Sequence, residues 1–264
     1  MSPLGDRPLG FIARESVRPS NWVALARMPR RYRHPIDGAR RYFTPAGAYP
    51  YRCEVRTPLG VVAPTLHSQH DMITVNEVFC REDYRVGDEA EVVVDIGSNI
   101  GISALYFLTR SERARAWLFE PVPRNVERLR ENLSSFEGRW HLDQTAVADR
   151  EGEETFSMEP TGRYGGLGPA DEGSISVRVR HIDDVLRQVL EAEGRIDVLK
   201  LDTEGVEART LAAASTDLLR RVDVIFAEDI AGEIQPPPGF AASRRASVLR
   251  LAQLDPAART YTSS

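Results

Sequence analysis

The hydrophobic pattern of the chain changes near residue 91, where continuous apolar runs begin to alternate with amphipathic stretches. The apolar runs are typical of strands covered on both faces of a sheet, and they predict core strands at residues 91–96, 116–119, 141–148, 196–201 and 222–227. Apolar residues at every third or fourth position predict helices at residues 102–108, 124–133, 182–192 and 207–214. This alternation indicates parallel pairing through right-handed crossovers, and therefore a doubly wound, mostly parallel α/β sheet with helices on both faces.

The segment before residue 91 has a different character. Residues 1–50 are rich in Pro, Arg and Gly, and they predict an irregular arm with one short helix near residues 22–27. Residues 51–62 alternate weakly around a Pro-Leu-Gly turn, which predicts a hairpin. A helix is expected at residues 71–79, with Asp71 near its start.

Two further regions complete the expected fold. Residues 154–158 and 174–180 predict a β insertion around a glycine-rich loop, and residues 241–254 predict a last helix. We therefore divide the chain into an N-terminal arm or cap at residues 1–65, an α/β domain at residues 66–232, and a C-terminal helix and tail at residues 233–264.

Composition and charge argue against several classes of function. A formal net charge of −5 disfavours general nucleic-acid binding, which needs a basic surface. No apolar run approaches the roughly 20 residues of a membrane helix, and charges and prolines interrupt the N-terminus before a signal peptide develops. We therefore expect a cytoplasmic protein without a membrane partner. Cys53 and Cys80 lack metal-ligand spacing and the five histidines are scattered, so no metal site is predicted.

The basic residues are distributed unevenly. Residues 1–56 hold eleven arginines and four acidic residues. We interpret this segment as a solvated arm, with a patch for an anionic partner such as a nucleotide-linked substrate as the alternative. Lys200 is the only lysine of the chain, which indicates a position where a compact ammonium differs from a planar guanidinium.

The strongest candidate site follows the first core strand. Ligands of open α/β sheets bind beyond the carboxyl ends of the strands, and the sequence Asp95-Ile-Gly-Ser-Asn-Ile-Gly101 begins there. Glycines let the backbone approach a ligand, and the next helix starts with unpaired N–H groups. The G-x-x-x-G spacing differs from the G-x-G-x-x-G pattern that binds a dinucleotide pyrophosphate. The candidate ligand-binding residues are Asp95, Gly97, Ser98, Asn99 and Gly101.

An acidic residue ends the second core strand. Glu120 follows Gly97 by 23 residues, an offset at which a carboxylate can bind the ribose hydroxyls of a nucleoside. The loop and the acid together predict an adenosine-type ligand without a pyrophosphate. The alternatives are a tight turn without a ligand and a solvated glutamate.

Charged residues also end the fourth and fifth core strands. Lys200 and Asp202 share a face of the fourth strand, and Glu228 and Asp229 end the fifth. Charges at the end of a buried strand are costly unless they are paired or functional. The group is either a charged cluster beside reacting atoms or an internal ion pair that holds the loop.

Five motifs, taken in order, resemble the FkbM-type methyltransferases over roughly residues 66–230. They are Asp95-Ile-Gly-Ser-Asn-Ile-Gly101, Glu120-Pro-Val-Pro-Arg-Asn125 with Leu129 and Asn132, His181-Ile-Asp-Asp-Val-Leu186, Leu199-Lys-Leu-Asp-Thr-Glu-Gly-Val-Glu207 and Val224-Ile-Phe-Ala-Glu228. The chain departs from the family at Ser98, where alanine is usual, and after residue 230, where the final strand hairpin of the fold is not evident.

The resemblance implies a class I, Rossmann-like fold that uses S-adenosylmethionine, releases S-adenosylhomocysteine, and acts on hydroxyls of sugars or other natural products. The residues that it implies for the cofactor are the loop from Asp95 to Gly101, Glu120 with Pro121 and Asn125, Ala146 near adenine, and Glu77 on a helix that closes over the amino acid portion. The expected partner is a small-molecule hydroxyl acceptor. Glycosylated, nucleotide-linked and carrier-linked acceptors and a homodimeric state are left open.

Our hypothesis for catalysis places Asp202 near the transferred methyl group and the cofactor. Lys200 and Glu204 would orient or deprotonate the acceptor hydroxyl, since an alcohol must lose its proton. A lysine base needs its pKa lowered by burial, and the nearby carboxylates oppose this. We therefore favour a carboxylate or His181 as the base and Lys200 as an orienting group.

Three other functions remain open at this point. The glycine loop and the acid also suit a nicotinamide-dependent oxidoreductase, although the loop spacing differs and no Tyr-x-x-x-Lys pair exists. Asp202 and Glu228 could hold a divalent metal for a metal-assisted O-methyltransferase. A non-catalytic binding or scaffold protein, with the arginine-rich arm docked on a carrier protein, is the alternative outside enzyme chemistry.

Overall fold

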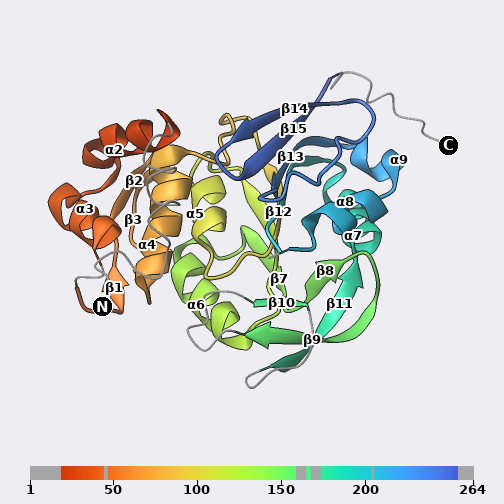
Figure 1. Ribbon diagram of the computed structural model, residues 1–264, viewed down its shortest axis with the longest axis horizontal. Helices are drawn as coiled ribbons and strands as arrows, with labels where there is room; N and C mark the ends of the chain where they lie inside the picture. Colours follow the sequence, from red (N-terminus) through yellow and green to blue (C-terminus); the bar gives the residue numbers. More distant parts are fainter. Residues whose placement is uncertain (1–18, 45–46, 159–164, 168–173, 204, 255–264) are drawn as a thin grey trace.

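The computed structural model describes residues 19–44, 47–158, 165–167, 174–203 and 205–254, around a seven-stranded sheet (Figure 1). In spatial order the strands are β14 (Phe240–Arg245), β15 (Val248–Gln253), β13 (Val222–Glu228), β12 (Ile196–Leu201), β5 (Val92–Ile96), β6 (Arg115–Phe119) and β7 (Trp140–Asp143). β15 is antiparallel to both of its neighbours, and the other pairs are parallel. The predicted mostly parallel α/β sheet is therefore confirmed.

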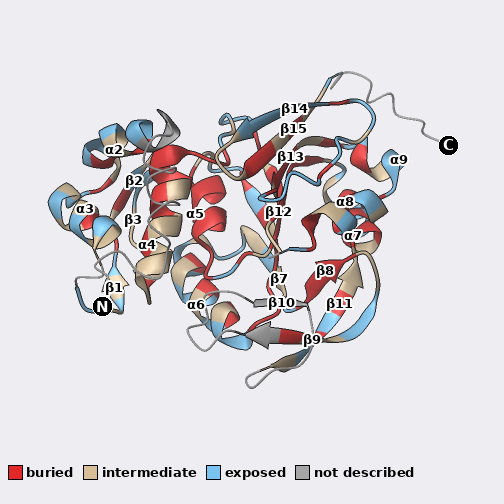
Figure 2. Ribbon diagram, in the orientation of Figure 1, coloured by how far each residue is buried: buried red, intermediate tan, exposed pale blue. Residues whose placement is uncertain are grey.

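Each face of this sheet has its own hydrophobic core. The core helices are α5 (Ile102–Leu108), α6 (Pro123–Leu133), α7 (Ile182–Glu193), α8 (Glu207–Ala213) and α9 (Thr216–Leu219). Successive strand side chains point to opposite faces, so Val93 packs with α5 and α6 whereas Val94 packs with α7, α8 and α9. Every residue of β5 is buried, which explains its continuous apolar run. Figure 2 shows buried residues on the sheet and on α5.

An N-terminal cap packs against the side of α5 away from the sheet (Figure 1). The cap contains α2 (Pro19–Arg31), α3 (Pro35–Phe43), the pairs β1 (Tyr51–Arg52) with β4 (Thr65–Leu66) and β2 (Val55–Thr57) with β3 (Gly60–Val62), α4 (Gln69–Val75) and the π-helix η1 (Asn76–Arg81). The predicted hairpin is the β2–β3 pair, and the helix expected at residues 71–79 is α4 continued by η1. All seven residues of α5 are buried because α5 lies between cap and sheet.

The helix predicted at residues 241–254 is wrong, because this region forms the β14–β15 hairpin. Alanine, arginine and leucine favour a helix, but an unpaired β13 would expose a row of backbone polar groups. β15 pairs with β13 instead and buries Val248, Leu249 and Leu251. The hairpin completes the central sheet, so the α/β domain extends beyond residue 232.

The single strand predicted at residues 141–148 is two strands in different sheets. β7 ends at Asp143, and β8 (Ala146–Ala148) joins a second sheet in the order β10 (Gly165–Leu167), β9 (Gly152–Met158), β11 (Ile175–His181), β8. Three polar residues, Asp143, Gln144 and Thr145, separate the apolar residues of the two strands, and the chain passes there from the partly buried edge strand β7 to the fully buried β8. Among the described helices, none is long and apolar enough to cross a membrane.

Candidate functional site

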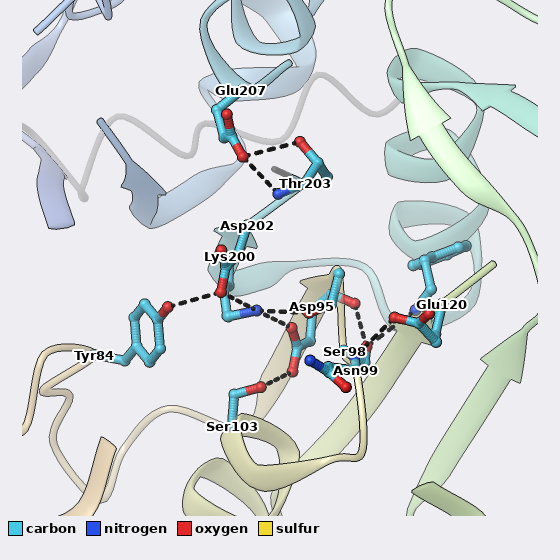
Figure 3. Close-up of polar contacts among 12 residues, drawn as sticks. Tyr84, Asp95, Ser98, Asn99, Ser103, Glu120, Lys200, Asp202, Thr203 and Glu207 are labelled. Carbon is cyan, nitrogen blue, oxygen red and sulfur yellow. Dashed lines mark hydrogen bonds and ion pairs between the residues drawn. The ribbon is translucent and has the colours of Figure 1, made fainter. Parts of the chain in front are cut away.

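The chain turns sharply after β5, directly against the end of β12 (Figure 3). Gly97 has a φ of +78°, in the left-handed region that glycine enters at little cost. A Cβ atom at this position would lie far inside van der Waals contact with the carbonyl oxygen of Asp202. The N–H of Asp202 donates to the carbonyl of Ile96 at 3.1 Å. Gly97 is therefore required by the close approach of two strand ends.

Ser98 fastens the loop to the neighbouring strand β6. Its hydroxyl donates to the carbonyl oxygen of Asp95 at 2.7 Å and accepts from the N–H of Phe119 at 3.2 Å. The side chain is buried, so it has no free surface for a ligand. This contact gives a structural reason for serine at the position where alanine was expected. Asn99, by contrast, is exposed and has a φ of +47°.

Glu120 and the glycine loop meet at one point, as the sequence predicted. One carboxylate oxygen, Oε2, accepts from the backbone N–H of Asn99 at 2.9 Å. The other, Oε1, accepts from the N–H of Val122 at 3.0 Å and from the side-chain amide of Asn125 at 3.2 Å. Burial raises the pKa of Glu120, and these three donors oppose the rise because they favour the ionised form. A preoriented carboxylate therefore lies where the ends of β5 and β6 meet.

Lys200 lies within hydrogen-bonding distance of two strand ends. Its ammonium donates to Asp95 Oδ1 at 2.9 Å and to the carbonyl of Gly97 at 3.0 Å, and it lies 3.4 Å from Asp202 Oδ2. The hydroxyl of Ser103 donates to Asp95 Oδ2 at 2.6 Å. The side chains of Asp95 and Lys200 are 0% and 2% exposed, whereas that of Asp202 is 30% exposed. Asp202 is therefore the carboxylate of this cluster that solvent can reach.

The surroundings of Lys200 keep it protonated. Burial lowers the pKa of the ammonium, but the charges of Asp95 and Asp202 outweigh burial and leave the pKa above its ordinary value. Lys200 therefore cannot easily give up its proton, which agrees with an orienting role and argues against a lysine base.

The loop after β12 is organised by Glu207, which ends the fourth motif but was not among the predicted site residues. Glu207 accepts from the N–H of Thr203 at 2.6 Å (Figure 3). It also accepts from the N–H of Gly205 at 3.0 Å. Both donors precede α8, which Glu207 begins, so the carboxylate satisfies backbone groups of the turn. Glu204, a predicted catalytic residue, lies outside the described residues.

His181 and Glu77 come from two other elements, the strand β11 and the π-helix η1. His181 ends β11, and its Nδ1 accepts from the N–H of Asp183 at 3.1 Å as the cap of α7. No hydrogen bond or ion pair described for His181 joins it to Lys200 or Asp202. Glu77 lies in η1 and forms an ion pair with Arg81 at 3.1 Å. The roles of His181 as a base and of Glu77 at the cofactor stay predictions.

Of the remaining cofactor candidates, Pro121 and Asn125 lie next to Glu120, and Ala146 begins the strand β8 of the second sheet. Pro121 is buried directly after Glu120, and Asn125 bonds its carboxylate from the first turn of α6. Ala146 is buried at the start of β8. Asn132, quoted with the second motif, donates to the carbonyl of Ile100 at 2.9 Å, so it supports the loop.

The two acids at the end of β13 differ in role. Asp229 is buried, forms an ion pair with Arg244 of β14, and accepts from the N–H of Glu233 at 2.8 Å. It therefore matches the alternative of an internal ion pair. Glu228 is half-buried at the end of β13. Within the described residues, no group of three or more His, Cys, Asp or Glu side chains could hold a metal ion.

Two further residues of the cluster carried little sequence signal. Ser103 is the only residue of the apolar helix α5 that is neither aliphatic nor aromatic, and that contrast could have identified it. Tyr84 donates from its hydroxyl to Asp202 Oδ2 at 3.2 Å across a separation of 118 residues. No local spacing connects two residues so far apart.

Comparison with known proteins gives a family and several relatives. Residues 95–255, more than half of the chain, match the family model described as the methyltransferase FkbM domain. The chain is 28% identical over 193 residues to the AMB antimetabolite synthetase AmbE of Pseudomonas aeruginosa, a match that covers 59% of this chain and 9% of AmbE.

Two shorter relatives are named as methyltransferases. The chain is 30% identical over 150 residues to the 2-O-methyltransferase NoeI of Sinorhizobium fredii, covering 49% of this chain and 59% of NoeI. It is 28% identical over 148 residues to the hexuronic acid methyltransferase AglP of Haloferax volcanii, covering 55% of this chain and 58% of AglP. The chain thus spans less than two thirds of the length of each of these relatives.

Proposed function

The chain belongs to the FkbM methyltransferase family, and on that premise we propose that it transfers a methyl group from S-adenosylmethionine to a hydroxyl oxygen of a small molecule. The observation that carries this proposal is the contact of Glu120 with the glycine loop at Asn99. A carboxylate has about four acceptor positions, and three N–H donors use three of them. Capacity for a hydroxyl donor such as a ribose remains, so the residues fit an adenosyl ligand.

The glycine loop would hold the cofactor. The side chains of Asp95, Ser103, Lys200 and Asp202, here called the Lys200 cluster, would lie beside the reacting atoms. Gly97, Asn99 and Glu120 belong to the binding part, and Asp202 is the half-exposed carboxylate beside it. S-adenosylmethionine, when bound, supplies an electrophilic methyl group on a sulfonium. The acceptor oxygen must lie in line with that group, and positioning of this kind accounts for several kcal/mol of a typical barrier.

Asp202 is the base that the geometry favours. With the cofactor bound, the acceptor oxygen would bond to the methyl carbon as the carbon–sulfur bond breaks, and the Asp202 carboxylate would take the hydroxyl proton. Lys200 keeps its proton and orients Asp202 through the contact at 3.4 Å. Nδ1 of His181 already accepts a hydrogen bond in the cap of α7, which makes this histidine a weaker candidate.

The names of three relatives support a class of acceptor. NoeI is named a 2-O-methyltransferase, AglP a hexuronic acid methyltransferase and AmbE an antimetabolite synthetase. The name of NoeI supports an oxygen as the methylated atom, and the names of AglP and AmbE support a sugar acid or another natural product as the acceptor.

Two measurements test this proposal. Calorimetry with S-adenosylhomocysteine and, separately, with NAD should give binding of the first only. Incubation with labelled S-adenosylmethionine and a panel of sugars, uronic acids and polyhydroxylated natural products should label a hydroxyl-bearing acceptor, with or without EDTA. Binding of NAD alone would favour an oxidoreductase, and binding of neither ligand would favour a scaffold protein. Loss of transfer in EDTA would point to a metal.

A further inference from the structure

Tyr84 is a buried tyrosine between η1 and β5 whose polar end meets the candidate site. Its ring packs edge-on against Phe226, with the ring centroids 5.7 Å apart. The ammonium of Lys200 lies 5.6 Å from the centre of the same ring. The hydroxyl donates to Asp202 Oδ2 at 3.2 Å (Figure 3). Tyr84 therefore contacts both charged residues that end β12.

The contacts of Asp202 are divided unequally between its two oxygens. Oδ2 accepts from Tyr84 and also faces the ammonium of Lys200 at 3.4 Å. Among the described residues, Oδ1 has no hydrogen-bond or ion-pair partner. Because the side chain is 30% exposed, one oxygen is held by the protein and the other is available to a ligand.

The backbone around Tyr84 is held from two sides. Glu82 has a φ of +58°, which is unfavourable for a residue other than glycine. Its carboxylate accepts from Arg27 at 2.9 Å and from Arg31 at 2.5 Å, both on α2. Arg245 of β14 donates to the carbonyl of Arg81 at 2.7 Å. The segment that carries Tyr84 is thus fixed to the cap and to the final hairpin.

We propose that Tyr84 is a positioning residue for methyl transfer, because it holds Oδ2 of Asp202 and thereby presents Oδ1 to the acceptor hydroxyl. This inference rests on the proposed function. A buried hydroxyl is costly without a hydrogen-bond partner, and a phenylalanine would fill the same apolar space at no such cost. The partner that satisfies this hydroxyl is the half-exposed carboxylate of the site.

The test compares Tyr84→Phe with Tyr106→Phe. The first change removes the hydroxyl and keeps the ring against Phe226 and Lys200. Tyr106 is also buried, packs against Phe79 and Phe107, and has no described hydrogen bond to the Lys200 cluster. A hydrogen bond to a charged group predicts about a tenfold or greater loss of kcat in Tyr84→Phe. Affinity for S-adenosylhomocysteine should stay within about twofold, and Tyr106→Phe should keep wild-type kcat.

A double-mutant cycle separates positioning from a general structural role. If Tyr84 acts through Asp202, Tyr84→Phe should cost almost nothing further in an Asp202→Asn background. Additive losses, or wild-type kcat in Tyr84→Phe, would overturn the inference. So would a loss of S-adenosylhomocysteine affinity equal to the loss of kcat, because Tyr84 would then serve the cofactor instead.

Failure of the proposed function would look different. In that case the wild-type chain itself would neither bind S-adenosylhomocysteine nor transfer a methyl group. A wild-type chain that does both, together with an unaffected Tyr84→Phe variant, would overturn the role of Tyr84 alone.

Discussion

The carboxylate of Glu120 accepts a hydrogen bond from the backbone N–H of Asn99 at 2.9 Å. The acid that follows β6 is thereby joined to the loop that follows β5. The two features that a ligand with an adenosine group needs, a close backbone and an acceptor for its hydroxyls, therefore form one structural unit.

Replacing Glu120 with glutamine should weaken cofactor binding. The new amide has one acceptor oxygen and places a donor where N–H groups already point, and the charge that strengthens the hydrogen bonds is lost. We expect affinity for S-adenosylhomocysteine, measured by calorimetry, to fall about tenfold or more. Glu127→Gln, at an exposed position of α6, is the matched control and should bind normally. Equal affinities in the two variants would contradict the assignment of Glu120.

The affinity should also depend on pH through Glu120. Burial raises its pKa above the ordinary value, and ribose hydroxyls donate to the ionised form. Affinity should therefore be constant near neutral pH and fall on acidification, at a higher pH than an ordinary glutamate would give. Calorimetry between about pH 4 and 8 should show this loss in the wild type, and Glu120→Gln should not show it. A wild-type affinity that stays flat over this range would argue against the prediction.

In the ligand-free protein, Glu120 should make the free energy of unfolding fall as the pH rises, whereas the cofactor affinity should fall as the pH is lowered. A raised folded-state pKa means that the folded chain binds the proton more tightly than the unfolded chain. The contribution of Glu120 to the free energy of unfolding is therefore present at low pH and is lost as the pH rises from the ordinary pKa to the raised one.

Alanine substitutions at Gly97 and Gly138 test how tightly the loop after β5 packs against the end of β12. Their φ values are +78° and +79°, so alanine pays the same left-handed strain at both, about 1–2 kcal/mol. A Cβ at Gly138 meets nothing within 4 Å, whereas at Gly97 it would overlap the Asp202 carbonyl. Urea unfolding should therefore show a clearly larger loss for Gly97→Ala. Similar losses would mean that the strand ends separate easily.

Lys200→Met should lower the free energy of unfolding by more than a lysine-to-methionine change usually does at an exposed position of a protein. Among the residues that the structure describes, the change leaves the fully buried carboxylate of Asp95 with Ser103 as its one remaining side-chain partner. Breaking a buried ion pair by removing one partner costs about 3–5 kcal/mol. Adding Asp95→Asn should recover part of that loss, because the unpaired charge disappears. Urea unfolding of the single and double variants tests this, and a double variant as unstable as Lys200→Met would refute it.

The pattern of the sequence located most of the core because burial and pattern are directly related there. The apolar run of β5 and the apolar helix α5 are covered on all sides, and the structure places both where they were predicted. The same reasoning failed at β15, where Leu249 and Leu251 occur in a stretch of good helix formers. Pairing with the open edge of β13 outweighed local propensity there.

The sequence alone determined the alternation of core strands and helices between β5 and β13 and the position of the glycine loop with Glu120, because parallel strands place their carboxyl ends at one edge. Only the tertiary structure decided which groups share a hydrogen bond or an ion pair at that edge. In the folded chain Ser98 bonds to the strand β6, Asp229 forms an ion pair with Arg244, and the hydroxyl of Tyr84 donates to Asp202. Such contacts join residues far apart in the chain, and they depend on side-chain directions that no periodicity encodes.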